Sequence, residues 1–254
     1  MKSNKNLISI IITYYKKKKY IKETLSSVLS QNYKKYEIIM VYDDPNKKDL
    51  KYILNLLKLF KLKKLVINKK NLGVAKSRNL AKKYCTGEFI AFLDSDDKWK
   101  KNKLSYQIKF MKKKSSLISF TSYDVIDEDS NVLRKNLVLV DPNYKTLAKS
   151  NFIGLSTIMI NRKIISKINF PNLKTQEDFA LWLQLLRQGI KFNHIKKSLS
   201  CWRKTSNSLS SKTYDKIKDA FKLFYIYENK NLINSIFSVL ILSYNKIIKS
   251  LIIK

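Results

Sequence analysis

The chain has 254 residues, of which 44% are hydrophobic, four are glycine and three are proline. This length can bury a sizeable core, and the composition excludes a chain divided by low-complexity linkers. The formal net charge of +33 attracts anions such as nucleotide diphosphates, nucleic acid or an acidic membrane surface, although Lys, Ile and Asn all have AT-rich codons and genome composition explains much of it.

The first half alternates apolar strands with amphipathic helices. We expect strands at 6–15, 36–44, 64–68 and 88–94, and helices at 19–33, 47–60 and 73–85. This alternation predicts right-handed crossovers and a mainly parallel sheet. In such sheets ligands bind beyond the carboxyl ends of the strands.

The second half changes character. We expect a strand at 116–126 with an antiparallel partner at 130–140, then a strand and short helix at 154–165, a helix at 175–190, and helical stretches at 212–229 and 231–249. Thr175 and Asp178 have the spacing of a capping box, and Gly189 is placed to end that helix.

Two carboxylates, Asp94 and Asp96, follow the strand at 88–94. Residues i and i+2 of extended backbone point the same way, so both carboxylates can reach one hard cation such as Mg²⁺ or Mn²⁺. The alternative is a strand-end turn with Asp caps. The position after a strand of a parallel sheet favours the cation site.

Further candidates lie at other strand and helix ends. Asp43 and Asp44 end the second strand, where one of them can cap the next helix. Arg78 lies near the expected anion site, or else forms a surface salt bridge. Glu177 and Asp178 begin a helix, where the helix dipole favours them, or where one serves as a general base.

Five segments in order resemble glycosyltransferase family 2, the inverting GT-A type. They are "ISIIITYYKKKKYIKETLSSVLSQNYKKYEIIMVYDD", "NLGVAKSRNLA", "GEFIAFLDSDDKW", "KTQEDFALWLQLLRQG" and "WRKTSNSLS". The resemblance implies an α/β fold, a GT-A-like three-layer sandwich with a mainly parallel central sheet plus C-terminal helices. The catalytic domain would be 1–211, with a nucleotide half at about 1–105 and an acceptor half at about 106–211, followed by a helical extension at 212–254.

The resemblance also implies residue roles. Asp178 would be the catalytic base with Glu177 beside it, and Asp96 with Asp94 would hold Mn²⁺ or Mg²⁺. The nucleotide-sugar would be bound by Thr13, Tyr15, Asp43 or Asp44, Arg78, Asp94, Ser95 and Arg203. Tyr15 would stack on the base, and Asp43, or Asp44 one residue on, would accept from its imide N–H.

The implied reaction is one in-line displacement that moves a sugar, from a UDP-sugar by expectation, to a hydroxyl of a glycan or lipid-linked acceptor in cell-surface polysaccharide or lipopolysaccharide synthesis. Three departures stand out: Thr13 replaces a common Pro, "VYDDPN" replaces Asp-Asp-Gly-Ser, and "WRKTSNSLS" lacks the His that follows the Arg in many members. Arg203 would then contact the diphosphate.

Two cysteines, Cys85 and Cys201, form neither a disulfide framework nor a metal-ligand spacing, which favours a reducing cytoplasm. The lone His194 is expected to be structural or at the surface. The stretch 232–254 contains several Ser and Asn residues, so we expect a packed or interfacial helix rather than a membrane span, with peripheral attachment to the inner face of an anionic membrane as one outcome.

Two rival functions remain. A sugar-phosphate nucleotidyltransferase would carry a glycine-rich loop after the first strand, where this chain has "TYYKKKKY". A nucleic-acid-binding protein is suggested by charge alone, but only five of the 52 basic residues are Arg, and the acidic strand ends would repel phosphate. We therefore expect no nucleic-acid partner.

Overall fold

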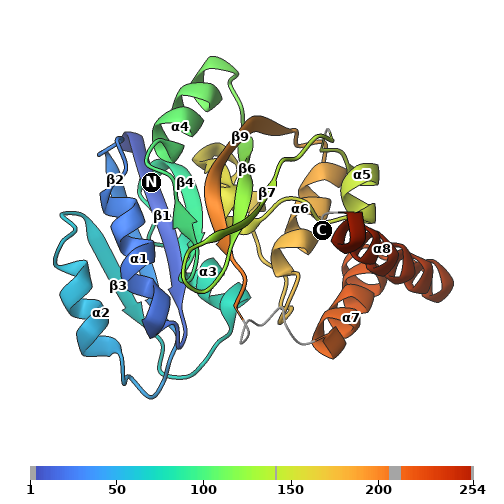
Figure 1. The fold of residues 1–254 in the computed structure, drawn as a ribbon, viewed down its shortest axis with the longest axis horizontal. Helices are drawn as coiled ribbons and strands as arrows, with labels where there is room; N and C mark the ends of the chain where they lie inside the picture. The colour runs from blue at the N-terminus through green and yellow to red at the C-terminus, as the bar shows by residue number, and fades with distance from the viewer. Residues whose placement is uncertain (1–3, 141, 206–212, 253–254) are drawn as a thin grey trace.

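The computed structural model describes residues 4–140, 142–205 and 213–252. Within them, strands form one sheet with helices on both faces (Figure 1). The strands are β1 (Asn4–Tyr14), β2 (Tyr36–Tyr42), β3 (Lys63–Ile67), β4 (Gly87–Asp94), β5 (Lys98–Trp99), β6 (Ile118–Ile126), β7 (Val132–Asn136), β8 (Met159–Asn161) and β9 (Phe192–Arg203). The helices are α1 (Lys18–Leu29), α2 (Leu50–Leu57), α3 (Val74–Lys82), α4 (Lys103–Lys113), α5 (Tyr144–Lys149), α6 (Glu177–Arg187), α7 (Thr213–Lys222) and α8 (Leu232–Ile252), with 3₁₀ turns at Leu155–Thr157 and Arg162–Lys167 and a π-helical turn at Leu223–Tyr227.

The sheet has the strand order β3-β2-β1-β4-β8-β6-β9-β5, with β7 paired to β6. Its first four strands are parallel, as expected from the alternating pattern. The other half is mixed, because β8 runs antiparallel to both β4 and β6 while β9 runs parallel to β6. The predicted α/β class and the C-terminal helices are confirmed.

Two hydrophobic layers enclose the sheet, because β1 is apolar on both faces. Ile10 and Ile12 pack in the layer that contains residues of α1, α2 and α4. Ile11 packs in the opposite layer, which contains residues of α3 and α6. The parallel strands are therefore covered on both sides, and their carboxyl ends are the open edge at which polar side chains gather.

Strand β9 was not predicted. Its pairing with β6 contains register shifts, which break the alternation that identifies a strand in sequence. The strand holds His194, whose Nε2 lies 3.1 Å from Ser122 Oγ and whose ring stacks on Phe120 at 4.6 Å. The structural interpretation of His194 is thereby confirmed.

The start of α6 corrects one prediction. Thr175 is not its cap: the cap position belongs to Gln176, which has a left-handed φ of 61°. Thr175 instead donates through its N–H and Oγ1 to Asp219 Oδ2 in α7, at 2.8 and 3.1 Å. Gly189 does follow the helix with a positive φ of 76°. Within the described part of the chain, no helix combines the length and apolar character that crossing a bilayer requires.

Candidate active site

The loop that follows β4 is fixed by Asp97, a residue to which the sequence assigned no role. Asp97 is 2% exposed, and its carboxylate accepts from Ser156 Oγ at 2.5 Å and from the Arg203 N–H at 2.9 Å. Its own N–H donates to the Asp94 carbonyl. Burial, together with the charges of Asp96 and Asp94, raises the pKa of Asp97 well above its usual value. Asp97 therefore shapes the loop through these contacts.

Arg78 joins the loop to α6. Its guanidinium donates to Asp94 Oδ1 at 2.7 Å and to the Glu177 carboxylate, and it lies 5.4 Å from the centre of the Phe170 ring. Arg78 is 4% exposed, so its pair with Glu177 is buried, whereas its pair with Asp94 is partly open to solvent. The predicted residues Arg78, Asp94 and Glu177 thus meet, although the sequence placed Arg78 on the nucleotide rather than between two carboxylates.

Asp178 follows Glu177 in the first turn of α6. Its Oδ1 accepts from the Phe179 N–H at 2.6 Å. Burial and then the charge of Glu177 raise the pKa of Asp178 to about 7, against the opposing effect of Arg78. A carboxylate that titrates near neutrality can both accept a proton and be present in its charged form.

These side chains line one cavity of about 260 Å³. Its walls include Arg78, Asp94, Asp97, Glu177, Asp178, Tyr123, Trp202 and Lys216. Residues from β4, α3, α6, β6, β9 and α7 therefore surround one space. Trp202 is 38% exposed, so an aromatic face is available beside the carboxylates.

Asp96 lies beside this cavity rather than in its wall. Its Oδ2 forms an ion pair with Lys17 Nζ at 2.7 Å, just before α1. Burial raises the pKa of Asp96 above its usual value, Lys17 lowers it, and the Asp94 carboxylate raises it. The Asp94 and Asp96 carboxylates are therefore close enough to interact electrostatically.

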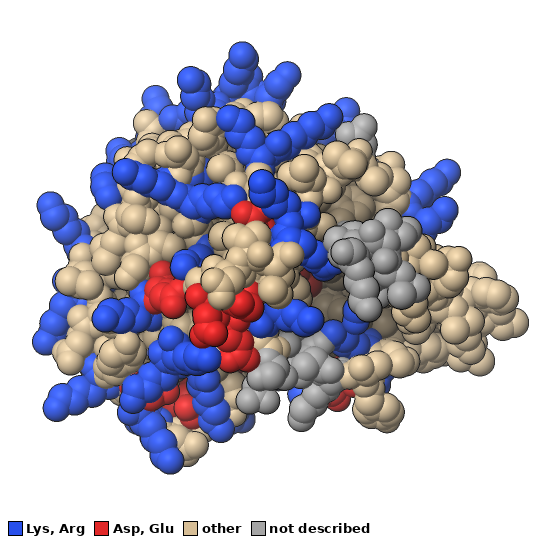
Figure 2. Space-filling view, in the orientation of Figure 1, with Lys and Arg blue, Asp and Glu red and all other residues tan. Residues whose placement is uncertain are grey.

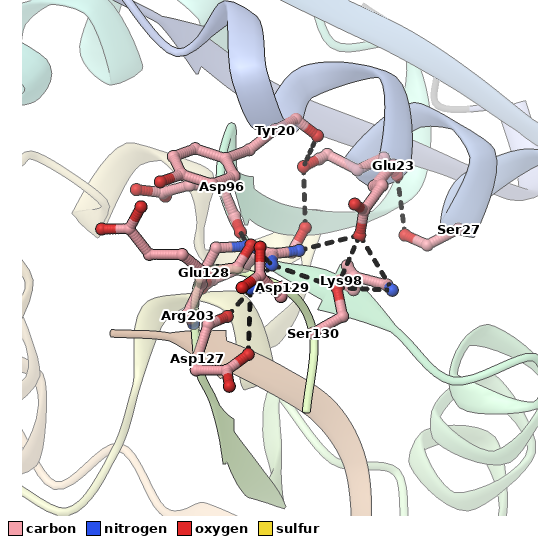
Figure 3. A network of polar contacts seen from close by, with 12 residues as sticks. Tyr20, Glu23, Ser27, Asp96, Lys98, Asp127, Glu128, Asp129, Ser130 and Arg203 are labelled. Carbon is pink, nitrogen blue, oxygen red and sulfur yellow. Dashed lines mark hydrogen bonds and ion pairs between the residues drawn. The ribbon is translucent and has the colours of Figure 1, made fainter. Parts of the chain in front are cut away.

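Arg203 is buried behind the loop in the polar network of Figure 3. Its Nε donates to the Asp96 carbonyl at 2.8 Å. Its Nη1 donates to the carbonyls of Asp127 and Glu128, and its Nη2 lies 3.0 Å from Glu23 Oε2. All three nitrogens thus bind protein groups, and the residue lies outside the cavity wall, so the predicted contact with a diphosphate stays a prediction.

Asp43 holds the loop that enters α3. Its Oδ1 accepts from Asn68 Nδ2 at 2.6 Å and from the Leu72 N–H at 2.9 Å, and its Oδ2 accepts from the Gly73 N–H at 2.9 Å. Gly73 has a φ of 81°, which glycine adopts without strain. Both carboxylate oxygens of Asp43 therefore serve the fold.

The remaining predicted residues lie along the same edge. Thr13 is the register partner of Asp94 across β1 and β4. Tyr15 follows β1 and is 40% exposed, Asp44 is buried at the end of β2, and Ser95 is buried in the loop after β4. The last five residues of the segment "WRKTSNSLS", 206–210, lie outside the described residues, as does the predicted domain boundary at 211–212.

No three His, Cys, Asp or Glu side chains within the described residues converge into a ready-made metal site. The two carboxylates of Asp94 and Asp96 provide hard oxygen donors only. That set suits a cation such as Mg²⁺ or Mn²⁺, which proteins often hold through one or two carboxylates while substrate phosphates complete the coordination.

Comparison with known proteins establishes the class. The model of glycosyl transferase family 2 matches residues 9–170. The chain belongs to this family, and it is a glycosyltransferase. That membership sets aside the sugar-phosphate nucleotidyltransferase alternative.

Two relatives are similar over most of their length. TuaG of Bacillus subtilis, whose name assigns it provisionally to teichuronic acid biosynthesis, is 35% identical over 224 residues, which are 88% of each chain. The Escherichia coli protein WfaP is 35% identical over 213 residues, 83% of this chain and 82% of its own. WfaP is named as a UDP-Glc:alpha-D-GlcNAc-diphosphoundecaprenol beta-1,3-glucosyltransferase.

Solved structures share the fold. TarS 1–349 of S. aureus, in complex with UDP-GlcNAc, superposes with a TM-score of 0.72 at 21% identity, over 89% of this chain and 65% of that one. The mannosyltransferase PcManGT of Pyrobaculum calidifontis, in complex with GDP-Man and Mn²⁺, gives 0.67 at 14% identity, over 88% and 64%. This chain thus spans less than two thirds of either of those chains, and at these identities the likeness concerns the fold.

Proposed function

We propose that this glycosyltransferase moves a sugar from a UDP-sugar to a hydroxyl of a lipid-linked glycan acceptor, with inversion at the anomeric carbon. The observation that carries the proposal is the cavity in which Asp178, with a pKa near 7, lies beside Asp94 and Arg78. The similarity to WfaP, whose name specifies a UDP-sugar donor and an acceptor linked to diphosphoundecaprenol, supports this choice of donor and acceptor.

Asp178 is the proposed general base. The Glu177 carboxylate is engaged by Arg78, whereas the described partner of the Asp178 carboxylate is the N–H of Phe179. In the reaction the acceptor hydroxyl loses its proton to Asp178, its oxygen bonds to the anomeric carbon, and the bond from that carbon to the diphosphate oxygen breaks. Arg78 keeps the pKa of Asp178 from rising further.

The donor nucleotide would occupy the open edge formed by β1, β2 and β4. Tyr15 offers an exposed ring for stacking on a base. Because both oxygens of Asp43 bind Asn68 and the loop before α3, Asp44 is the better candidate to accept from the base imide. Trp202 supplies a flat apolar face on which an acceptor sugar ring can pack.

A divalent cation fits the oxygen donors of Asp94 and Asp96, with Mn²⁺ and Mg²⁺ both suited. When bound, it would supply positive charge to the leaving diphosphate. Asp97 and Arg203 bind one another and the backbone of the loop that carries these two carboxylates, which supports a fixed position for them. Lys17 neutralises Asp96 in the described structure.

A thermal-shift series tests the proposal. UDP with Mn²⁺ should raise the melting temperature, because a ligand that binds only the folded state stabilises it. Asp96→Ala should abolish the metal-dependent part, and Asp129→Ala, an exposed Asp on the turn after β6, should keep it. Asp178→Asn should retain the shift and lose transfer of radiolabelled sugar. A wild-type protein indifferent to every nucleotide diphosphate tried with Mn²⁺ contradicts the proposal.

A further inference from the structure

Helix α8 carries an apolar stripe on its outer surface. Its members recur at helical spacing and are between 42% and 65% exposed: Ile233, Ile236, Phe237, Leu240, Ile241 and Tyr244. Figure 2 shows Lys and Arg over much of the visible face, whereas the arm on the right, where Figure 1 places α8, is almost uniformly uncharged. An amphipathic helix normally turns such a stripe inward, whereas these side chains stay exposed and no element among the described residues covers them.

The charges around the stripe favour an anionic partner. The acidic side chains in the segment from α7 to α8 are buried or paired. Asp219 and Glu228 are 5% exposed, and Asp215 forms an ion pair with Lys174. Lys218 and Lys246 of the same unit are exposed. A second copy of the chain would bring another +33 charge against this one, which opposes self-association through the same face.

The stripe is fixed relative to the cavity through α7. Asp219 Oδ2 accepts from the N–H groups of Lys174 and Thr175, and Gln176 Nε2 donates to the Lys216 carbonyl at 2.8 Å. These contacts tie α7 to the segment that leads into Asp178. Helix α8 in turn packs on α7 and α5. The apolar stripe and the cavity are therefore linked through α7.

Lys216 connects the cavity with helix α8. It lines the cavity that contains Asp178. Burial, and then the charge of Lys246 on α8, lower the pKa of Lys216 to about 8. An anionic group between Lys216, in the cavity wall, and Lys246, on the helix that carries the stripe, would relieve the repulsion of these two like charges.

We infer that α8 docks by its apolar stripe on a bilayer surface that contains anionic lipid, so that the phosphate of a lipid-linked acceptor meets Lys216 and Lys246 at the mouth of the cavity. The acceptor part of this inference rests on the proposed function. The helix lies in the interfacial plane, with the stripe among the acyl chains and the lysines at the headgroups.

Flotation with vesicles of phosphatidylcholine and phosphatidylglycerol tests the docking. The full chain should float with them, and binding should fall when salt is raised or phosphatidylglycerol is left out. Phe237→Gln with Leu240→Gln should lower the partition coefficient roughly tenfold or more. The matched control is Leu59→Gln with Leu62→Gln, two comparably exposed apolar side chains between α2 and β3, which should float like wild type.

Sedimentation and thermal shift separate the outcomes. If wild type does not float, or if F237Q/L240Q floats unchanged, the inference is overturned. It is equally overturned if wild type is a dimer that F237Q/L240Q converts to a monomer. The thermal shift with UDP and Mn²⁺ reports on the proposed function alone. A retained shift without flotation sinks the membrane inference only, whereas flotation without any nucleotide response sinks the proposed function.

Discussion

The Asp94–Asp97 loop and helix α8 differ in what they place inside the protein. The loop and its partners bury charge: Asp97, Arg78 and Arg203 are each less than 5% exposed. Helix α8 does the reverse and leaves Ile233, Phe237 and Leu240 more than half exposed. Both arrangements oppose the usual partition of polar and apolar side chains.

The difference lies in how each region is compensated. Every buried charge around the loop has a hydrogen-bonded or ionic partner within the chain, for instance Arg78 between Asp94 and Glu177. The α8 stripe has no covering element among the described residues. The charges of the loop are thus compensated within the chain, whereas the α8 stripe is compensated only with a partner.

The largest expected effect is on catalysis at Asp178. Replacing Asp178 by Asn keeps its shape and removes its ability to accept a proton, so we expect kcat to fall by about 10²–10⁴-fold. Radiolabelled sugar transfer measures this loss. Glu177→Gln is the companion variant, and a loss in E177Q as large as in D178N would move the base to Glu177.

The pH profile follows from the same group. Because the pKa of Asp178 is raised to about 7, the carboxylate is protonated below that pH, and kcat/KM should decline on the acid side with a midpoint near 7. The raised pKa also lowers stability progressively as pH rises from about 4 to about 7. D178N should therefore unfold at a higher temperature than wild type at pH 8, and at a similar one at pH 4. A wild-type profile flat between pH 5 and 8 would rule out this assignment.

Removing Arg78 should cost stability. Arg78→Met leaves Asp94 and Glu177 facing each other without their shared cation, and breaking such a buried pair costs about 3–5 kcal/mol. Urea denaturation measures the change. The double variant R78M/E177M should recover part of it, because one uncompensated carboxylate is gone. An R78M protein as stable as wild type would show that these charges are solvated.

A smaller effect is expected at Arg203. Arg203→Lys keeps the charge, but a lysine side chain cannot reach the Asp96 carbonyl, the Glu128 carbonyl and the Glu23 carboxylate together. The free energy of unfolding should therefore fall by about 2 kcal/mol. The loop then loosens, and the UDP–Mn²⁺ thermal shift should shrink. Arg162→Lys, which alters a contact with the Cys85 carbonyl far from the loop, should leave that shift unchanged.

The sequence predicted the parallel half of the sheet and most of the strand and helix ends at which the candidate site residues lie. Buried strands and the carboxylates that follow them are local patterns of sequence. It could not predict how the charges pair. Arg78 meets Glu177 across 99 positions of sequence, and Arg203 reaches Asp96 across 107. No role was predicted for Asp97, because only the folded chain brings Ser156 and Arg203 into contact with it. The one available signal was a third carboxylate beside the pair Asp94 and Asp96.

The smallest expected effect tests the other side of the comparison. Leu240 of α8 is 58% exposed, whereas Leu183 of α6 is fully buried. Leu183→Gln should lower the free energy of unfolding by about 3–5 kcal/mol, since it removes apolar packing and buries an amide group without a hydrogen-bond partner. Leu240→Gln should change it by less than about 0.5 kcal/mol, because the side chain contacts mainly water. Urea denaturation in the absence of lipid compares the two. A large loss at Leu240 would mean that the stripe is already covered within the chain or by a second copy, and α8 would then be no different in kind from the interior of the site.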